Sequence, residues 1–173
     1  DGGLLLLTNA AGDNDRDFLQ LVKEGFKYEA GKQLAFNIRF KTSDATQTDI
    51  VAGLQLTDTT PLDVTDGVFF LKEDGSTSIS FIVEKDSTQS TLTLPNALAD
   101  DTFMTLGFVF DPKDQKFHVF QDNVLAGTVV NTNAPDDEEL TVSFGVQNGE
   151  AVAKTMTIDY VGAMKERTAN TEL

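Results

Sequence analysis

His118 is the only histidine in the chain, so any histidine chemistry must use it. A Ser–His–Asp triad would need it as the general base, and a metal site with several histidines is excluded. Its neighbours Phe117 and Val119 are apolar. Side chains on a strand alternate between the two faces, so we expect His118 to point toward solvent. The pattern favours a surface histidine on a strand without a catalytic role.

Asp13, Asp15 and Asp17 are the one place in the sequence where three acidic residues occupy alternate positions. With Glu24 at the twelfth position they resemble the opening of an EF-hand calcium loop. However, Phe18 occupies the sixth position, where the sharp turn needs glycine. The alternative is a glycosidase strand that presents carboxylates to a cleft, but the residues between these acids are polar and could not anchor its back face. We expect a solvated loop with weak cation binding at most.

The other acids show no catalytic spacing. The run Asp136–Glu139 and the pair Asp63 and Asp66 are typical of solvated surface loops, and motifs for phosphate loops and nucleophile elbows are absent. We therefore predict no catalytic residue, no cofactor-binding residue and no enzyme activity. A bound calcium ion is the one cofactor left open.

Charge and composition exclude further classes of protein. The chain has 13 basic and 28 acidic residues, so its net charge is 13 − 28 = −15, which repels nucleic acid and anionic lipid. There is no cysteine, so disulfides and thiol sites are excluded. The apolar run Leu4 to Leu7 is far too short to span a membrane. A length of 173 residues suits one domain.

Apolar residues recur at every second position along most of the chain, which predicts strands with one buried face. The pattern is clearest at Leu34, Phe36, Ile38 and Phe40. It returns in the runs 50–56, 79–83, 104–110, 140–146 and 156–160, with shorter runs at 69–71, 92–94, 117–120 and 124–130. Turn sequences separate the runs, and Asp122-Asn123 suits a two-residue hairpin turn. The sequence therefore predicts an all-β domain of two packed antiparallel sheets.

The segment 17–24 is ambiguous between helix and strand. Phe18, Leu21 and Val22 have helical spacing, whereas Leu19 and Leu21 would suit a strand. We favour a strand there.

Aromatic side chains that could stack on a sugar ring are scarce. There is no Trp, and Tyr160 falls in the inward register of its strand. Tyr28 is then the first candidate for an exposed ring, with Phe120 or one of Phe69 and Phe70 as alternatives. This scarcity weakens a lectin hypothesis, although polar recognition assisted by calcium would remain.

Several segments resemble the concanavalin A-like (laminin-G-like) jelly-roll family. They are 33–41, 103–111, 116–127 and 157–162, which follow one another in the family's order. Asn123 stands where glycine is usual, and Asn also tolerates a positive φ. The resemblance covers residues 30 to 165 and implies a concanavalin A-like sandwich. The Glu-x-Asp-x-Glu pattern of its glycosidase branch does not occur.

Three further segments resemble parts of small virion structural proteins of tailed phages. They are residues 51–61, 84–87 and 146–150. This resemblance implies a bacteriophage head decoration protein on the outer capsid surface, with the major capsid protein as its partner. A homo-oligomer is expected, and a trimer is favoured because it would match the local threefold positions of a capsid lattice. The alternative function is a lectin-like carbohydrate-binding module on a virion or cell surface.

The N-terminal run Leu4, Leu5, Leu6 and Leu7 has two interpretations. It is either a strand of the domain's own sheet or a subunit contact that pairs along an exposed strand edge. In this layout residues 1–29 are N-terminal strands of the single domain, 30–166 form the sandwich, and 167–173 form a loose tail.

Overall fold

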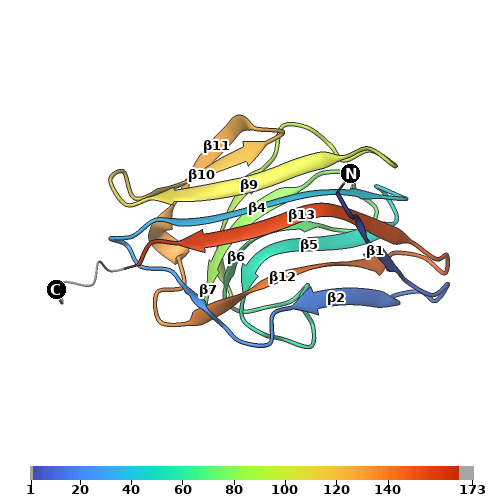
Figure 1. Cartoon of the computed structure of the whole chain (residues 1–173), viewed down its shortest axis with the longest axis horizontal. Helices are drawn as coiled ribbons and strands as arrows, with labels where there is room; N and C mark the ends of the chain where they lie inside the picture. Colours follow the sequence, from blue (N-terminus) through green and yellow to red (C-terminus); the bar gives the residue numbers. More distant parts are fainter. Residues whose placement is uncertain (1, 168–173) are drawn as a thin grey trace.

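The computed structural model describes residues 2–167, which form two stacked antiparallel sheets (Figure 1). Sheet A has the strand order β1-β13-β4-β9-β10-β11, and sheet B has the order β2-β12-β5-β6-β7-β8 with β3 paired to β12. The elements are β1 (Leu5–Thr8), β2 (Arg16–Gln20), β3 (Phe26–Lys27), β4 (Leu34–Thr42), β5 (Thr48–Gln55), β6 (Gly67–Lys72), β7 (Ser80–Lys85), β8 (Thr88–Thr93), β9 (Met104–Asp111), β10 (Lys116–Gln121), β11 (Val124–Val130), the 3-10 helix η1 (Asn131–Asn133), β12 (Glu139–Asn148) and β13 (Thr155–Lys165). The predicted all-β, two-sheet sandwich is confirmed. Within residues 2–167, no helix has the length and apolar character needed to cross a membrane.

The hydrophobic core lies between the sheets, where the alternating residues of both meet. On β4 the four apolar side chains of the predicted pattern are each at most 2% exposed. Phe108 of β9 packs against four other rings at centroid distances of 5.3–6.4 Å: Phe36, Phe70, Phe81 and Phe117. Burying one such side chain contributes about 1.5–3 kcal/mol, so this aromatic cluster is a main source of stability.

Sheet B is also buried on part of its outer face. Val51, Phe69 and Ile82 point outward from three adjacent strands, and Val64 from the β5–β6 connection packs over them. All four are at most 5% exposed. The connection therefore closes this face of sheet B, whereas the outer face of sheet A stays open.

The β10–β11 hairpin turns at Asp122 and Asn123, whose φ angles are 49° and 64°. Two successive positive φ values are typical of a type I′ turn, which Asp and Asn tolerate, so the predicted hairpin is confirmed. The turn is tied to the start of β9, because the Thr105 amide donates to Asp122 Oδ1 over 2.8 Å.

A β-bulge changes the phase of β13. Ile158 lies opposite Phe40, and Tyr160 lies opposite Arg39, so Asp159 is an extra residue with no partner of its own on β4. Beyond the bulge Tyr160 shares the outward face of Arg39 and is 41% exposed. The prediction that Tyr160 points inward is therefore wrong.

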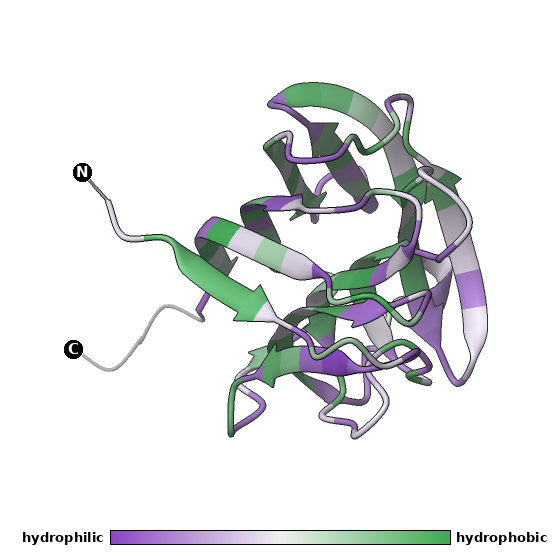
Figure 2. Cartoon of the chain, turned by 90° about the vertical axis from the view of Figure 1, so that its right-hand side faces the viewer, coloured by the Kyte–Doolittle hydropathy of each residue, from purple (hydrophilic) through white to green (hydrophobic). Residues whose placement is uncertain are grey.

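The N-terminal strands belong to both sheets. β1 pairs with β13 at the edge of sheet A, and Leu7 is buried while Leu4, Leu5 and Leu6 are exposed. Figure 2 shows this strand as a continuous hydrophobic ribbon beside the N-terminus. Of the ambiguous segment 17–24, residues 17–20 lie in β2, as favoured, whereas residues 21–24 are not in a strand. Of the predicted loose tail, residues 168–173 lie outside the described residues.

Candidate functional site

A groove crosses the outer face of sheet A. Gly162, Asn37, Gly107 and Phe120 stand in one row across β13, β4, β9 and β10. Two of the four positions carry no side chain, so the face is hollow there, with a volume of about 570 Å³. The groove is lined by Ala35, Phe36, Asn37, Thr105, Gly107, Phe108, Val109, Phe120, Asn123, Gly162, Ala163 and Met164. Figure 1 looks onto this face of the molecule.

A side chain on either glycine of the groove floor would crowd its neighbours. A Cβ atom on Gly107 would lie 3.1 Å from the Phe36 carbonyl oxygen and 3.2 Å from Asn37 Cβ. A Cβ atom on Gly162 would lie 3.0 Å from Asn37 Oδ1. Glycine at both positions therefore keeps the floor low and lets the Asn37 amide lie across it.

One rim of the groove carries aromatic and charged groups. In the row next to the floor, Tyr160 lies beside Arg39. The Arg39 guanidinium donates to Asp159 Oδ2 over 2.5 Å and stacks 4.2 Å above the ring centre of Phe103. Arg39 is thus neutralised by its neighbour, and none of the residues that line the groove is charged.

The lining combines apolar walls with neutral polar groups. Phe120 is half-buried and Met164 is 62% exposed, so both present apolar surface to the groove. Asn37 and Asn123 are exposed amides, which can each donate and accept hydrogen bonds. Such a concave, mainly apolar site with a few convergent polar groups is the usual form of a small-ligand site.

The aromatic residues that the sequence offered as exposed sugar-stacking rings differ in their solvent exposure. Tyr28 is 3% exposed and packs edge-on against Phe110 at 4.8 Å, so its prediction as an exposed platform is wrong. Phe69 and Phe70 are each 2% exposed and cannot serve either. Phe120 remains, and it lines the groove.

The predicted cation loop does not converge. Asp13 and Asp17 are exposed, and Asp17 lies within β2, so no EF-hand loop forms. Asp15 Oδ2 instead accepts the Gly12 amide over 3.2 Å. Within residues 2–167, one group of acidic and histidine side chains is close enough together to share a metal ion. It consists of Asp111, Asp114 and His118.

The remaining acids divide into surface and buried groups. Asp136 is exposed and pairs with Lys85 over 2.5 Å, as expected of a solvated loop. Asp66 is 5% exposed, so its assignment to the solvated surface is wrong; its Oδ1 accepts the Asp86 amide. Glu84 is also buried, and burial raises the pKa of its carboxyl group. Neither buried acid lines the groove.

Solved structures share this fold. The carbohydrate recognition domain of Emp46p in its potassium-bound form matches with a TM-score of 0.67 and 13% identity over 92% of this chain and 87% of that one. An endo-1,3-beta-glucanase from Streptomyces sioyaensis matches with a TM-score of 0.64 and 14% identity over 96% and 77%. A protein of unknown function from Shewanella oneidensis MR-1 matches with 0.64 and 19% identity over 99% and 72%.

The chain therefore has the concanavalin A-like lectin and glucanase fold. No protein-family model and no curated protein matches its sequence. The structures named above include a sugar-recognition domain and a hydrolase, and fold does not decide between such functions. They give no support to the resemblance to phage virion proteins.

Proposed function

We propose that this chain is a carbohydrate-binding module that holds a neutral glycan in the groove on the outer face of sheet A. The observation that carries the proposal is the groove itself, an open hollow with a glycine floor, a phenylalanine wall and two exposed amides. Pyranose rings have apolar C–H faces that pack on apolar and aromatic side chains. Their hydroxyl groups both donate and accept, as the amides of Asn37 and Asn123 do.

The charge distribution supports a neutral ligand. The chain carries a net charge of −15, and its field disfavours anionic sugars at long range. The one arginine beside the groove, Arg39, is paired with Asp159. Anionic glycans would therefore find no free positive charge in the lining.

Binding is favoured over hydrolysis for a chemical reason. Glycoside hydrolysis generally uses two carboxyl groups on either side of the scissile bond. No Asp or Glu lines the groove. A sugar held there would meet no general acid and no nucleophile, so we propose a module that binds without cleaving.

A glycan array followed by calorimetry tests this proposal. We expect hits among neutral oligosaccharides, with binding lost in Phe120→Ala and weakened in Asn37→Ala. Asn96→Ala is the matched control, because Asn96 is exposed and outside the groove, and only its backbone contacts Gln121. A complete absence of hits, or binding that survives Phe120→Ala, would contradict the proposal.

A structural role on a virion is the second candidate, and β1 favours it. Leu6 is 58% exposed on β1, the edge strand of sheet A, and Leu4, just before this strand, is 56% exposed. An apolar edge strand is a ready site for pairing with another chain. A decoration protein held through this edge would co-purify with phage heads at a fixed ratio, and Leu6→Asp would release it. Recovery only as free protein would exclude this role.

A further inference from the structure

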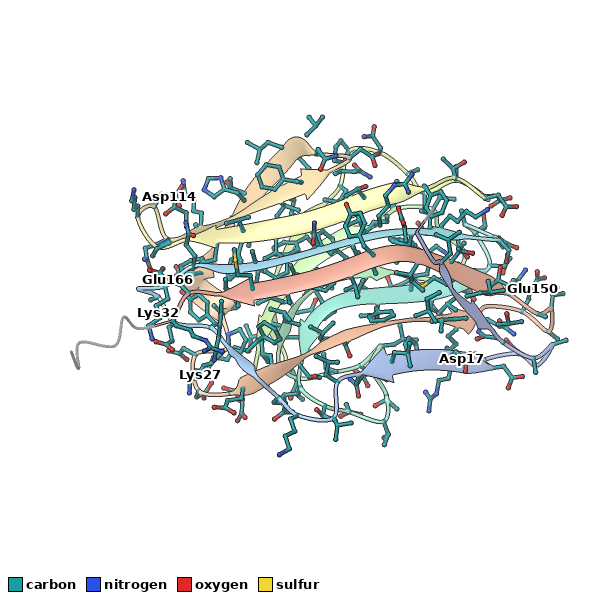
Figure 3. The ribbon with its side chains drawn as sticks, viewed as in Figure 1. Asp17, Lys27, Lys32, Asp114, Glu150 and Glu166 are labelled. Atoms are coloured by element: carbon teal, nitrogen blue, oxygen red, sulfur yellow. The ribbon has the colours of Figure 1, made fainter. Side chains whose placement is uncertain are left out.

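Asp111, Asp114 and His118 form a cluster at one end of the same outer face. One carboxylate oxygen from each aspartate and one ring nitrogen of His118 all lie within 4.8 Å of one another. Asp111 ends β9, His118 lies in β10, and Asp114 is in the turn between them, at the left end of the molecule in Figure 3. The hairpin thus brings together residues that the chain separates by only three and four positions.

Backbone amides orient both carboxylates. Asp111 Oδ1 accepts the Lys113 amide over 2.8 Å, and Asp114 Oδ1 accepts the Lys116 amide over 3.2 Å. Asp114 Oδ2 lies 2.9 Å from His118 Nε2. Hydrogen bonds of this kind to the non-coordinating atoms fix the orientation of metal ligands in known sites.

The negative charge of the cluster is only partly compensated. Among residues 2–167, the one ion pair within 4.0 Å of these carboxylates is Asp114 with His118. Lys113 and Lys116 are close in sequence, but neither pairs with a carboxylate in that range. A bound cation would supply the positively charged partner that Asp111 lacks.

We propose that Asp111, Asp114 and His118 bind a first-row divalent metal ion of the Zn²⁺ type. The ligand set is two carboxylate oxygens and one imidazole nitrogen, which suits Zn²⁺, whereas Ca²⁺ takes six to eight oxygens. Zinc–ligand bonds of about 2.1 Å place tetrahedral ligand atoms roughly 3.4 Å apart. The 2.9 Å separation of Asp114 Oδ2 and His118 Nε2 is already near that value. Asp114 is exposed, which leaves a fourth position for water.

The site lies beside the groove but does not depend on it. His118 is directly opposite Val109, which lines the groove. The metal proposal rests on the three side chains alone and stands whether or not a glycan binds. Its test uses the metal without any sugar, so the two proposals can fail separately.

Calorimetric titration of tag-free protein with ZnCl₂ tests the metal site. We expect saturable binding of one ion per chain and a raised melting temperature, both lost in His118→Gln and in Asp114→Asn. Asp13→Asn is the matched control, because it removes one acid from the other acidic segment, and it should bind like the wild type. An equal concentration of CaCl₂ should not compete.

The single histidine allows a direct spectroscopic readout. Protein labelled with ¹⁵N-histidine gives one imidazole signal set, and we expect its nitrogen shifts to move to the metal-bound range on stoichiometric addition of Zn²⁺. Acidification should reverse the change, because protons compete for the ligand atoms. Unmoved imidazole shifts, or zinc binding that persists in His118→Gln, would overturn the proposal and leave an ordinary His–Asp ion pair.

Discussion

Tyr160 of β13 lies directly opposite Arg39 of β4. Ile158, two residues earlier on β13, lies opposite Phe40, which is only one residue from Arg39. The bulge at Asp159 absorbs the extra residue and turns the tyrosine to the outer face of sheet A. Asp159 itself pairs with Arg39 over 2.5 Å. The same one-residue shift places Gly162, rather than Val161, opposite Asn37 in the floor of the groove.

The two tyrosines should differ in solvent access. Tyr28 is 3% exposed and Tyr160 is 41% exposed, and the chain has no tryptophan to mask their emission. We expect acrylamide to quench the emission of Tyr28→Phe, in which Tyr160 remains, and to leave that of Tyr160→Phe largely protected. Equal quenching of the two variants would show that the bulge does not turn Tyr160 outward.

Filling the groove should block ligand binding without unfolding the protein. Ala35 is half-buried on the outer face and lines the groove, so Ala35→Leu would place its side chain in the hollow. We expect at least a tenfold loss of glycan affinity, because a single clash or lost contact costs about 1.4 kcal/mol or more. Ala151→Leu, in the exposed β12–β13 turn, is the control. Unchanged affinity in Ala35→Leu would move the site elsewhere.

Asp44 should contribute stability that acid removes. Burial raises its pKa, but the Gln47 amide, the Lys154 ammonium and the Thr46 amide outweigh that effect and lower the pKa to about 2. The unfolded value is 3.8, so the contribution is present above about pH 4 and is lost as the pH falls toward 2. Asp44→Asn should reduce the free energy of unfolding by about 2 kcal/mol at pH 7 and by much less near pH 2. Urea unfolding at both pH values checks this; equal losses would contradict it.

Lys72 should lower the stability of the fold at neutral pH, and alkali should relieve that loss. It is 1% exposed, and burial lowers its pKa from 10.5 to about 8, although Asp49, Asp74 and Asp44 oppose the shift. Between these two pKa values the unfolded chain binds more protons than the folded chain. The free energy of unfolding therefore rises with pH over this range. From pH 8 to 9.5 the wild type should gain on the order of 2 kcal/mol relative to Lys72→Met. Parallel pH profiles would show that Lys72 is not desolvated.

Most strands could be predicted because alternation is a local signal, and β4 is the clearest case. The bulge could not be predicted from the apolar positions Ile158 and Tyr160 alone, since both fit one uninterrupted strand. A signal was nevertheless present. The apolar residues Val161 and Ala163 continue β13 in the opposite phase, as a single inserted residue requires.

The candidate sites were harder to predict, because they depend on register across strands. Gly107 and Gly162 are 55 positions apart (162 − 107), and only the order of strands in sheet A brings them into one row. The alternation of residues 117–120 indicates only where His118 points, whereas the hairpin brings Asp111 and Asp114 to it. The spacing of these three residues around a predicted turn was the available signal.

The groove on sheet A is proposed to bind a neutral glycan. The most direct measurement is a ¹H–¹⁵N NMR titration with the neutral oligosaccharides that score highest on the array. The largest shifts should fall on the amides of Gly107, Gly162, Asn37 and Phe120, with sheet B unaffected. Perturbations that map to sheet B, or no perturbation by any neutral oligosaccharide, would contradict this proposal.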